Sequence, residues 1–385
     1  MGGQTRLQRG FWRLLHRITP VFITRKYNYT CDAITESAPC LIVSNHVTNT
    51  DPFFVGLAIK DGPPAYVASE HLMRLGLVSK LINALLAPIP RPKAASGAGT
   101  VKNCLKRLRE GDSVVLFAEG DCTWDGLSHG IFPSTGKLVK ASGAKLVTFR
   151  IEGGYLSRPR WSKKLRPMRM HGGPVRVYTP EELAAMTNEE VTAAIDRDIF
   201  EDAWARQREQ RLPIASERRA EGLEQALAVC PKCGGIGTLA SRDNTVFCRK
   251  CGMNAYVEKD GFFDSAAAFR TVAEWEAWQR AELKRVFANG ECRDTGEPIP
   301  CVLRRIDSEG RRERPRKVKL SANTAPGALM LDGKPLPFER ISRASMVKTE
   351  RLLFTADDGY YELKSRKGGL RRILLVFKAA KGIDY

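Results

Sequence analysis

Two residue types that can move a proton lie five positions apart in the segment LIVSNHVTNTDPFFVG, residues 41–56. An imidazole such as His46 takes up a proton near neutral pH, and a carboxylate such as Asp51 can fix its tautomer and stabilise its charged form. If a turn brings Asp51 back to His46, the two residues form a general base with its orienting acid. The alternative is a structural histidine beside an aspartate that is the N-cap of a helix, with Pro52 at the first helical position.

Three further blocks follow in order: PIPRPK at 88–93, LFAEGDCTWDG at 116–126 and KLVTFRIEGGY at 145–155. Together, over about residues 10–210, they resemble the glycerolipid acyltransferase family typified by bacterial 1-acylglycerol-3-phosphate acyltransferases. The residues that match motifs of that family are Asn45, His46 and Asp51 in N-H-x-x-x-x-D, Arg91 in the arginine-bearing block, and Phe117, Glu119 and Gly120 in F-P-E-G-T-R-S.

The resemblance implies an O-acyltransferase that moves a fatty acyl group from acyl-CoA or acyl carrier protein to the hydroxyl of a lysophosphatidic acid-like glycerolipid, in phospholipid biosynthesis. It implies direct transfer, with His46 as the base and Asp51 as its partner. Four residues are expected to bind substrate: Asn45, Arg91, Glu119 and Gly120. Of these, Arg91 would contact an anionic group of the acceptor, because a guanidinium matches phosphate geometry.

The third block departs from the family pattern at one position. Where the family has threonine, arginine and serine, this chain has Asp121, Cys122 and Thr123. The change removes a guanidinium that could bind phosphate and adds a carboxylate. A nucleophilic Cys122 would need a neighbouring base, and the sequence identifies none for it. Three of the other histidines, His71, His129 and His171, lack partners at catalytic spacing and are expected to be structural or exposed.

A second pattern is C-x-x-C, fourteen residues, C-x-x-C, with a glycine after each pair. A tetrahedral zinc site needs four thiolates at such spacing, so the ligands predicted for a structural Zn²⁺ are Cys230, Cys233, Cys248 and Cys251. Rubredoxin-type iron is the alternative metal, and a redox dithiol pair is a third interpretation. The chain has 10 cysteines, and the other six show no framework spacing. A reducing compartment is therefore expected.

The elements around these motifs indicate an α/β acyltransferase domain with a mixed sheet and flanking helices. Strands are expected in CLIVSN, PAYVAS, SVVLFAEG and AKLVTFRIEG, and helices over 52–60, 71–86, 97–110 and 134–142. Helix starts are expected at Thr179 and Thr187 because each precedes a glutamate at capping-box spacing. The domains predicted are a membrane-interface segment 1–30, a catalytic domain 31–228, a zinc ribbon 229–262, a linking helix 263–289, and a small β-rich, pleckstrin-homology-like domain 290–385.

Composition limits the class of protein. The chain has 385 residues, more than one compact core usually holds, and a hydrophobic content of 43%, which excludes a disordered chain. Its net charge of +19 attracts anionic partners, although charge alone does not choose among nucleic acid, phospholipid headgroups and a phosphorylated substrate. With the resemblance, the expected partners are an anionic membrane surface, a lysophospholipid acceptor and an acyl thioester donor, and nucleic acid is not expected.

The first thirty residues predict an amphipathic helix. Its apolar stripe consists of Phe11, Trp12, Leu14, Leu15 and Ile18, and its flanking basic residues are Arg6, Arg9, Arg13 and Arg17. Such a helix can lie in a membrane interface or pack on its own domain. Without a spanning run or a secretory cleavage site, the expected location is the cytoplasmic face of the cell membrane, as a peripheral protein. The rival function is a non-catalytic membrane- or nucleic-acid-binding protein on the same scaffold.

Overall fold

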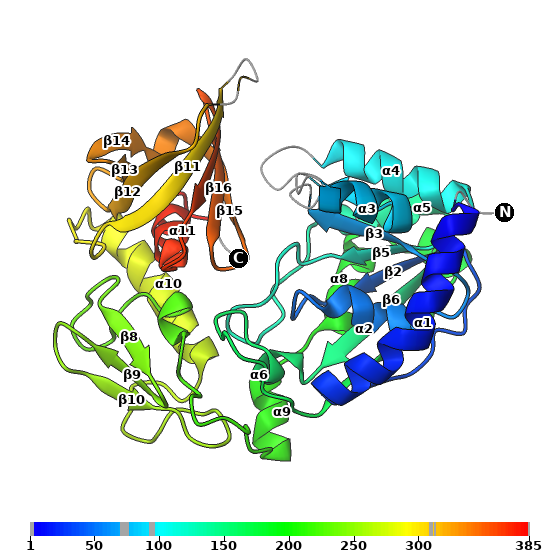
Figure 1. Ribbon diagram of the computed structural model, residues 1–385, viewed down its shortest axis with the longest axis horizontal. Coiled ribbons are helices and arrows are strands. Elements are labelled where there is room, and N and C mark those ends of the chain that lie inside the picture. The colour runs from blue at the N-terminus through cyan, green and yellow to red at the C-terminus, as the bar shows by residue number, and fades with distance from the viewer. Residues whose placement is uncertain (1–3, 70–76, 92–96, 308–310, 312, 384–385) are drawn as a thin grey trace. The chain divides into compact units, whose positions relative to one another are not determined.

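The computed structural model describes residues 4–69, 77–91, 97–307, 311 and 313–383 (Figure 1). The chain divides into two compact units. The first comprises Met1–Pro159 and Leu165–Leu212, and the second comprises Arg160–Lys164 and Pro213–Tyr385. The predicted end of the catalytic domain was residue 228, whereas residues 213–228 belong to the second unit.

The first unit is built on a seven-stranded mixed sheet with the order β1-β7-β6-β2-β5-β3-β4. All neighbouring strands pair in parallel except β6 and β7, which are antiparallel. The strands are β1 (Tyr29–Cys31), β2 (Cys40–Ser44), β3 (Ala65–Ser69), β4 (Ile89–Arg91), β5 (Val114–Phe117), β6 (Lys145–Glu152) and β7 (Met170–Tyr178). The central strands β2 and β5 are buried along their whole length, as parallel strands covered on both faces usually are.

Nine helices of the first unit, counted over its described residues, are α1 (Arg6–Tyr27), α2 (Asp51–Ala58), α3 (Leu77–Leu86), α4 (Ala98–Arg109), α5 (Ser134–Ser142), α6 (Gly154–Ser157), α7 (Pro180–Ala185), α8 (Asn188–Ile199) and α9 (Ala203–Gln210). Buried side chains of α4, α5 and α8 share one apolar core with β2, β5 and β6. Elsewhere on the sheet, Phe54 of α2 packs on Tyr29 of β1 and Tyr27 of α1. Both α1 and α2 lie in front of the sheet in Figure 1.

The predicted α/β architecture is therefore confirmed. The expected strands correspond to β2, β3, β5 and β6, and the expected helices correspond to α2, α3, α4 and α5. Residues 71–76 of the predicted helix 71–86, His71 among them, lie outside the described residues. Capping boxes form at Thr179 with Glu182 and at Thr187 with Glu190, as their spacing predicted.

The second unit begins with a short 3₁₀ turn, η2 (Leu223–Gln225), and a three-stranded antiparallel ribbon of order β10-β9-β8. Its strands are β8 (Leu239–Arg242), β9 (Thr245–Cys248) and β10 (Asn254–Tyr256). Beyond helix α10 (Val272–Ala288) the chain forms a seven-stranded antiparallel sheet of order β14-β13-β12-β11-β17-β16-β15. The strands of this sheet are β11 (Ile299–Asp307), β12 (Arg316–Asn323), β13 (Ala328–Leu331), β14 (Lys334–Pro337), β15 (Ile341–Val347), β16 (Arg351–Ala356) and β17 (Gly359–Lys364). The 3₁₀ turn η3 (Phe338–Arg340) lies between β14 and β15, and helix α11 (Leu370–Ala380) follows β17. The predicted β-rich C-terminal region is confirmed, and its likeness to pleckstrin-homology domains stays a prediction.

Helix α10 differs from the predicted linking helix 263–289. It begins nine residues later, at Val272, because the Thr271 side chain accepts a hydrogen bond from the Glu274 amide and caps it there. It is also no exposed linker. Its Trp275 and Gln279 side chains are buried and bond to backbone atoms just before the first cysteine pair, so the helix is part of the core of the second unit.

Helix α1 packs on its own domain along one side, and its place in a membrane interface stays a prediction. Trp12, which the sequence placed on the membrane-facing stripe, is 8% exposed and packs close to Gly56 of α2. The opposite side carries Leu14, Ile18 and Phe22, which are 52–58% exposed at helical spacing. Within the part of the chain described, no helix has both the length and the apolar character needed to cross a bilayer.

Candidate active site

The candidate site forms where two neighbouring parallel strands end. Strands β2 and β5 pair up to Ser44 and Phe117, so the loops that follow them leave the sheet at the same edge. His46 lies two residues beyond β2, and its backbone amide donates a hydrogen bond of 2.7 Å to Glu119 Oε1 in the loop after β5. The carboxyl edge of a parallel sheet is where α/β proteins usually bind ligands.

His46 and Asp51 are directly bonded: Nδ1 of His46 lies 2.8 Å from Oδ2 of Asp51. The carboxylate is fully buried and also accepts bonds from the Val47 amide and from the amide and hydroxyl of Thr48. Asp51 is the first residue of α2 rather than its N-cap, which is Thr50. The carboxylate turns back into the loop because those donors lie there. A carboxylate held by this many donors has a fixed orientation, and it in turn orients the imidazole ring.

The imidazole is held on its other sides as well. The ring of Phe117 stacks on it with centroids 4.5 Å apart, and Nε2 lies 3.4 Å from Sγ of Cys122. Burial lowers the pKa of His46, but the neighbouring Cys122 and Asp51 outweigh burial and leave its pKa above 6.5. Since Nδ1 donates to Asp51, Nε2, which faces the sulfur of Cys122, is the nitrogen that can exchange a proton.

Glu119 connects the loops after the two strands. Its Oε1 accepts from the His46 amide, and its Oε2 accepts from the His129 amide at 3.1 Å. Burial raises the pKa of Glu119 to about 8, although both amide bonds act in the opposite direction. At neutral pH this carboxyl group is therefore mostly protonated, and its O–H can donate to a substrate oxygen.

Arg91 and Gly120, predicted from separate motifs, lie side by side. Gly120 has φ +77°, and a Cβ placed there would lie 2.5 Å from the ring of Phe132 and 3.2 Å from Nη1 of Arg91. The guanidinium of Arg91 stacks over that same ring at 4.4 Å. Burial lowers the pKa of Arg91, and the Asp121 carboxylate opposes this shift. Only glycine fits at this position, both by backbone conformation and by space.

Asn45, the residue before His46, is bonded within the protein. Its side chain is fully buried, and its amide nitrogen donates to the carbonyl of Ile151 at 2.9 Å. Its amide oxygen accepts from the backbone N–H of the same residue at 2.8 Å. Asn45 thus joins the loop after β2 to strand β6 beside His46, and a substrate contact for it stays a prediction.

Residues that the sequence did not single out line a cavity of about 10 Å³ beside His46 and Glu119, among them Tyr155 and Glu201. This volume holds about one water molecule, so the cavity does not report acyl chain length. His129, expected to be structural or exposed, bonds Asp125 Oδ1 at 2.9 Å through Nε2. It comes close to the site only because Glu119 binds its amide, a contact with no signal in the sequence.

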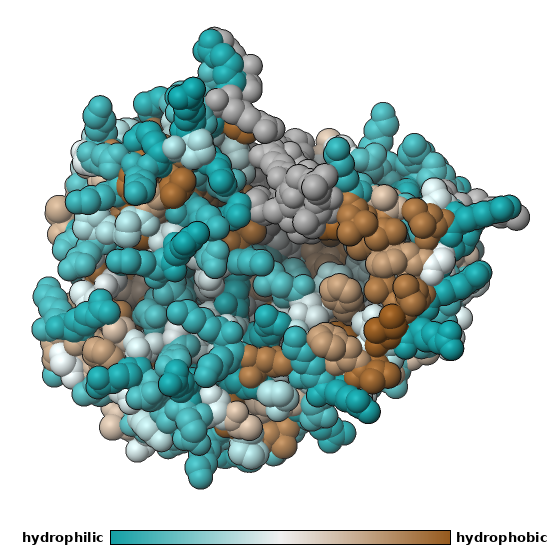
Figure 2. Space-filling view, in the orientation of Figure 1, coloured by the Kyte–Doolittle hydropathy of each residue, from teal (hydrophilic) through white to brown (hydrophobic). Residues whose placement is uncertain are grey.

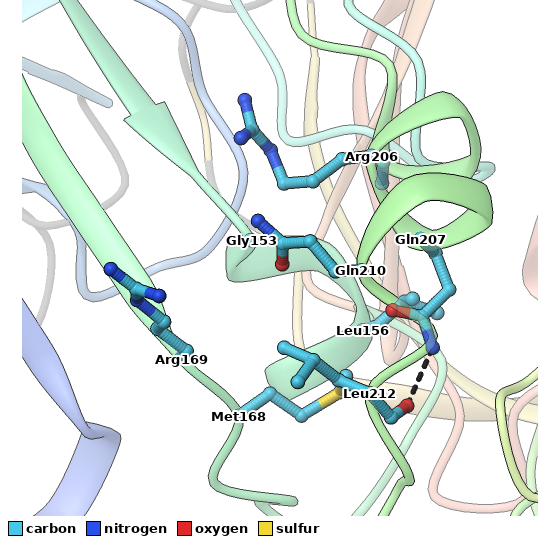
Figure 3. A pocket seen from close by; sticks show the side chains of 9 residues that line it. Gly153, Leu156, Met168, Arg169, Arg206, Gln207, Gln210 and Leu212 are labelled. Carbon is cyan, nitrogen blue, oxygen red and sulfur yellow. Dashed lines mark hydrogen bonds between the residues drawn. The ribbon is translucent and has the colours of Figure 1, made fainter.

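A second cavity of similar size lies between α6 and α9, and Figure 3 shows the side chains around it. Of its two charged lining residues, Arg169 and Arg206, the second is already paired, at 2.8 Å with Glu201 and at 3.0 Å with Glu152. Gln207 donates to the Leu212 carbonyl at 2.6 Å. With Arg206 and Gln207 paired within the protein and no histidine in its lining, this cavity is a weaker candidate for catalysis than the loops around His46.

The predicted metal ligands Cys230, Cys233, Cys248 and Cys251 lie together in the second unit, with all their sulfur atoms within 4.8 Å of one another. The Sγ atoms of Cys230 and Cys251 are 3.7 Å apart, and those of Cys233 and Cys248 are 3.8 Å apart. Tetrahedral zinc with Zn–S bonds near 2.3 Å requires sulfur pairs about 3.8 Å apart. The four thiols therefore fit a structural Zn²⁺, and they could also hold tetrahedral iron.

The comparison with protein families concerns the first unit. Residues 26–152 match the family model described as Acyltransferase. The match confirms the predicted family resemblance for that part of the chain, and it spans His46, Asp51, Arg91 and Glu119. Among solved structures, the chain is similar to the 1-acyl-sn-glycerophosphate (LPA) acyltransferase PlsC from Thermotoga maritima, at 13% identity and a TM-score of 0.39, over 49% of this chain and 76% of that chain. No curated protein matches the chain.

Proposed function

We propose that this protein transfers a fatty acyl group from a thioester, acyl-CoA or acyl carrier protein, to the hydroxyl of a lysophosphatidic acid-like glycerolipid in phospholipid biosynthesis. The observation that carries the proposal is the 2.8 Å bond between His46 and a buried, fully hydrogen-bonded Asp51. A scaffold kept only for binding would have no need for a base oriented in this way. The family match over residues 26–152 supports the reaction class.

The positions of the side chains support the following chemistry. His46 takes the hydroxyl proton through Nε2 as the hydroxyl oxygen attacks the acyl carbonyl, and Asp51 stabilises the imidazolium that forms. Thiolate is a good leaving group, so orientation and base catalysis supply much of the acceleration. Glu119 donates to a substrate oxygen, and Arg91 binds the phosphate of the acceptor beside Gly120.

The role of Arg91 predicts a dependence on acceptor charge. Losing a charge-assisted contact to an anion costs about 2–5 kcal/mol, so Arg91→Ala should lower transfer to lysophosphatidic acid roughly thirtyfold or more. Transfer to an uncharged monoacylglycerol should change little. Arg109→Ala, which removes an exposed guanidinium from α4, is the matched control and should leave both rates unchanged. Rates on the two acceptors test the proposal, and transfer only to monoacylglycerol, indifferent to Arg91, would contradict the phosphate assignment.

We also propose that the protein works as a peripheral protein on the anionic cytoplasmic face of the cell membrane. Helix α1 has no acidic residue and carries exposed basic side chains beside its exposed apolar side. Figure 2 shows apolar side chains gathered over the region of α1 to α3, and the exposed residues there include Ile18, Phe22, Phe53 and Leu81. Such a combination binds interfaces that contain anionic lipid.

Vesicle binding tests this location. The full chain should sediment with vesicles that contain phosphatidylglycerol, less so as salt rises, and duplex DNA should not compete. Ile18→Glu with Phe22→Glu should abolish sedimentation, while Val175→Glu, at a comparably exposed position on β7, should not. If the wild type, the double variant and Val175→Glu bind the vesicles equally, or if DNA competes with the vesicles, the membrane assignment is refuted.

A further inference from the structure

Cys122 lies against the catalytic histidine. Its Sγ is 3.4 Å from Nε2 of His46, and its side chain is 5% exposed. With Asp51 bonded to Nδ1 at 2.8 Å, the three side chains form a continuous chain of thiol, imidazole and carboxylate. A nucleophile within hydrogen-bond reach of a base, which a third group orients, is the arrangement of covalent catalysis. The base that the sequence could not identify for Cys122 is His46.

The loop that carries the thiol is fixed in place. The Thr123 amide donates to the carbonyl of His46 at 3.0 Å, so the residue after Cys122 is tied to the histidine backbone. The Thr123 hydroxyl donates to Asp125 Oδ1 and accepts from the Gly126 amide, both at 3.0 Å. These bonds lock the turn after β5, and the short approach of sulfur to Nε2 is a property of that turn.

The short distance between Sγ of Cys122 and Nε2 of His46 affects how an acceptor hydroxyl can react. Both nitrogens of His46 already have partners, Asp51 at Nδ1 and Cys122 at Nε2. A hydroxyl needs Nε2 as its base, so it competes with the thiol as long as the sulfur carries its proton. Once Cys122 is acylated, its sulfur has no proton to donate, and Nε2 can accept a proton from the hydroxyl.

We propose that Cys122 is the nucleophile that first takes the acyl group, so that transfer proceeds through a thioester on this residue; the proposal rests on the acyl transfer proposed above. In the first step Sγ attacks the carbonyl carbon of the donor thioester while its proton passes to Nε2 of His46. The tetrahedral intermediate expels the donor sulfur, which takes the proton from His46 and leaves as a thiol. One carbon–sulfur bond forms and one breaks, with no change of oxidation state.

In the second step the acceptor hydroxyl gives its proton to Nε2 of His46 as its oxygen attacks the Cys122 thioester. The carbon–sulfur bond breaks, the product oxygen ester leaves, and the proton returns from His46 to Sγ. The first step exchanges one thioester for another and is close to thermoneutral, while the second forms the more stable oxygen ester and drives the cycle. The family resemblance implied direct transfer, and Cys122 in place of the arginine changes that expectation.

Intact-protein mass spectrometry of the full chain tests the proposal. With palmitoyl-CoA and no acceptor, we expect one palmitoyl group per chain, together with a burst of one free CoA per site. Peptide mapping should place the group on Cys122, and neutral hydroxylamine should remove it. Added lysophosphatidic acid should consume the adduct at least as fast as steady-state transfer.

Variants separate the covalent route from direct transfer. Cys122→Ala should abolish the adduct and lower transfer at least a hundredfold, while Cys122→Ser should give a much slower enzyme whose oxygen-ester adduct resists hydroxylamine. Cys292→Ser, which alters an exposed cysteine of the second unit, should acylate like the wild type. Serine is close in size to cysteine, so the Cys122→Ser variant should fold even if Cys122→Ala folds poorly. The chemistry of the adduct that Cys122→Ser forms then still reports on the mechanism.

The outcomes distinguish this inference from the function on which it rests. Wild-type transfer in folded Cys122→Ala, or steady transfer with neither adduct nor burst in the wild type, overturns the covalent step and leaves His46-dependent acyl transfer standing. An adduct on Cys122 that no glycerolipid hydroxyl discharges supports the nucleophile and overturns the proposed acceptor instead.

Discussion

Replacing His46 with alanine is expected to lower acyl transfer by at least about 10²–10⁴-fold, because it removes the group that takes the acceptor proton. The protein should remain folded. The His46 side chain is 20% exposed at a strand end, and Asp51 keeps its bonds to the Val47 amide and to Thr48 when the imidazole is gone. Initial rates with lysophosphatidic acid, combined with thermal unfolding of the same samples, measure both parts of this expectation.

The structure provides a matched control in His171. Nε2 of that residue lies 3.2 Å from Asp32 Oδ2, the same pair of residue types, but at the surface, with the two side chains 41% and 73% exposed. His171→Ala should leave the rate within about twofold, because exposed ion pairs contribute little. A His46→Ala enzyme that is folded and as active as His171→Ala would remove His46 from the mechanism.

Asp51→Asn has a pH signature in addition to a lower rate. The carboxylate is one of the two groups that raise the pKa of His46, so its removal should lower that pKa. The base form of an imidazole exists above its pKa, so the acid limb of the pH–rate profile should move to lower pH in Asp51→Asn. The wild-type limb should lie above 6.5. A limb that does not move, or moves upward, would show that Asp51 does not act through His46.

The second large effect concerns the four clustered thiols. We expect the purified protein to hold one zinc ion per chain, and its removal to unfold the ribbon, because structural zinc contributes on the order of 10–16 kcal/mol in small domains. Unfolding should extend to α10, since its Trp275 donates to the carbonyl of Val229, the residue before Cys230. The first unit has its own core and should keep its unfolding transition.

Elemental analysis and calorimetry measure these effects. Cys248→Ser should lose the metal and the transition of the second unit, while Cys292→Ser, an exposed cysteine outside the cluster, should keep both. One iron instead of zinc would keep the ligand assignment and change the metal. Protein prepared without chelators that contains neither metal, yet keeps its ribbon folded, would contradict a metal site.

Local sequence was sufficient for features whose parts lie close together in the chain. Asp51 follows His46 by five residues, so one turn could join them, and the capping boxes at Thr179 and Thr187 each link residues three positions apart. The four cysteines come in two C-x-x-C turns, each of which brings two thiols together, and the short β8–β9 hairpin between the turns brings the two pairs together. In each case short-range geometry is decided by spacing.

Contacts made through the sheet could not be predicted in the same way. Cys122 and His46 are 76 residues apart in the chain, and they meet because β2 and β5 are adjacent and pair up to Ser44 and Phe117. The sequence contains the two strands but not their order or register. Asn45 illustrates the same limit, since this residue of the N-H-x-x-x-x-D motif binds the backbone of Ile151, 106 residues away.

The most direct measurement of the proposed reaction follows the acyl group itself. Purified full-length protein is incubated with isotope-labelled palmitoyl-CoA and lysophosphatidic acid on vesicles that contain phosphatidylglycerol, and the lipids are analysed by mass spectrometry. We predict label in phosphatidic acid with the wild type and none above background with His46→Ala. The same incubation is run with monoacylglycerol as the acceptor. If, with both acceptors, the label stays in palmitoyl-CoA or appears only as free palmitate, acyl transfer to a glycerolipid hydroxyl is contradicted.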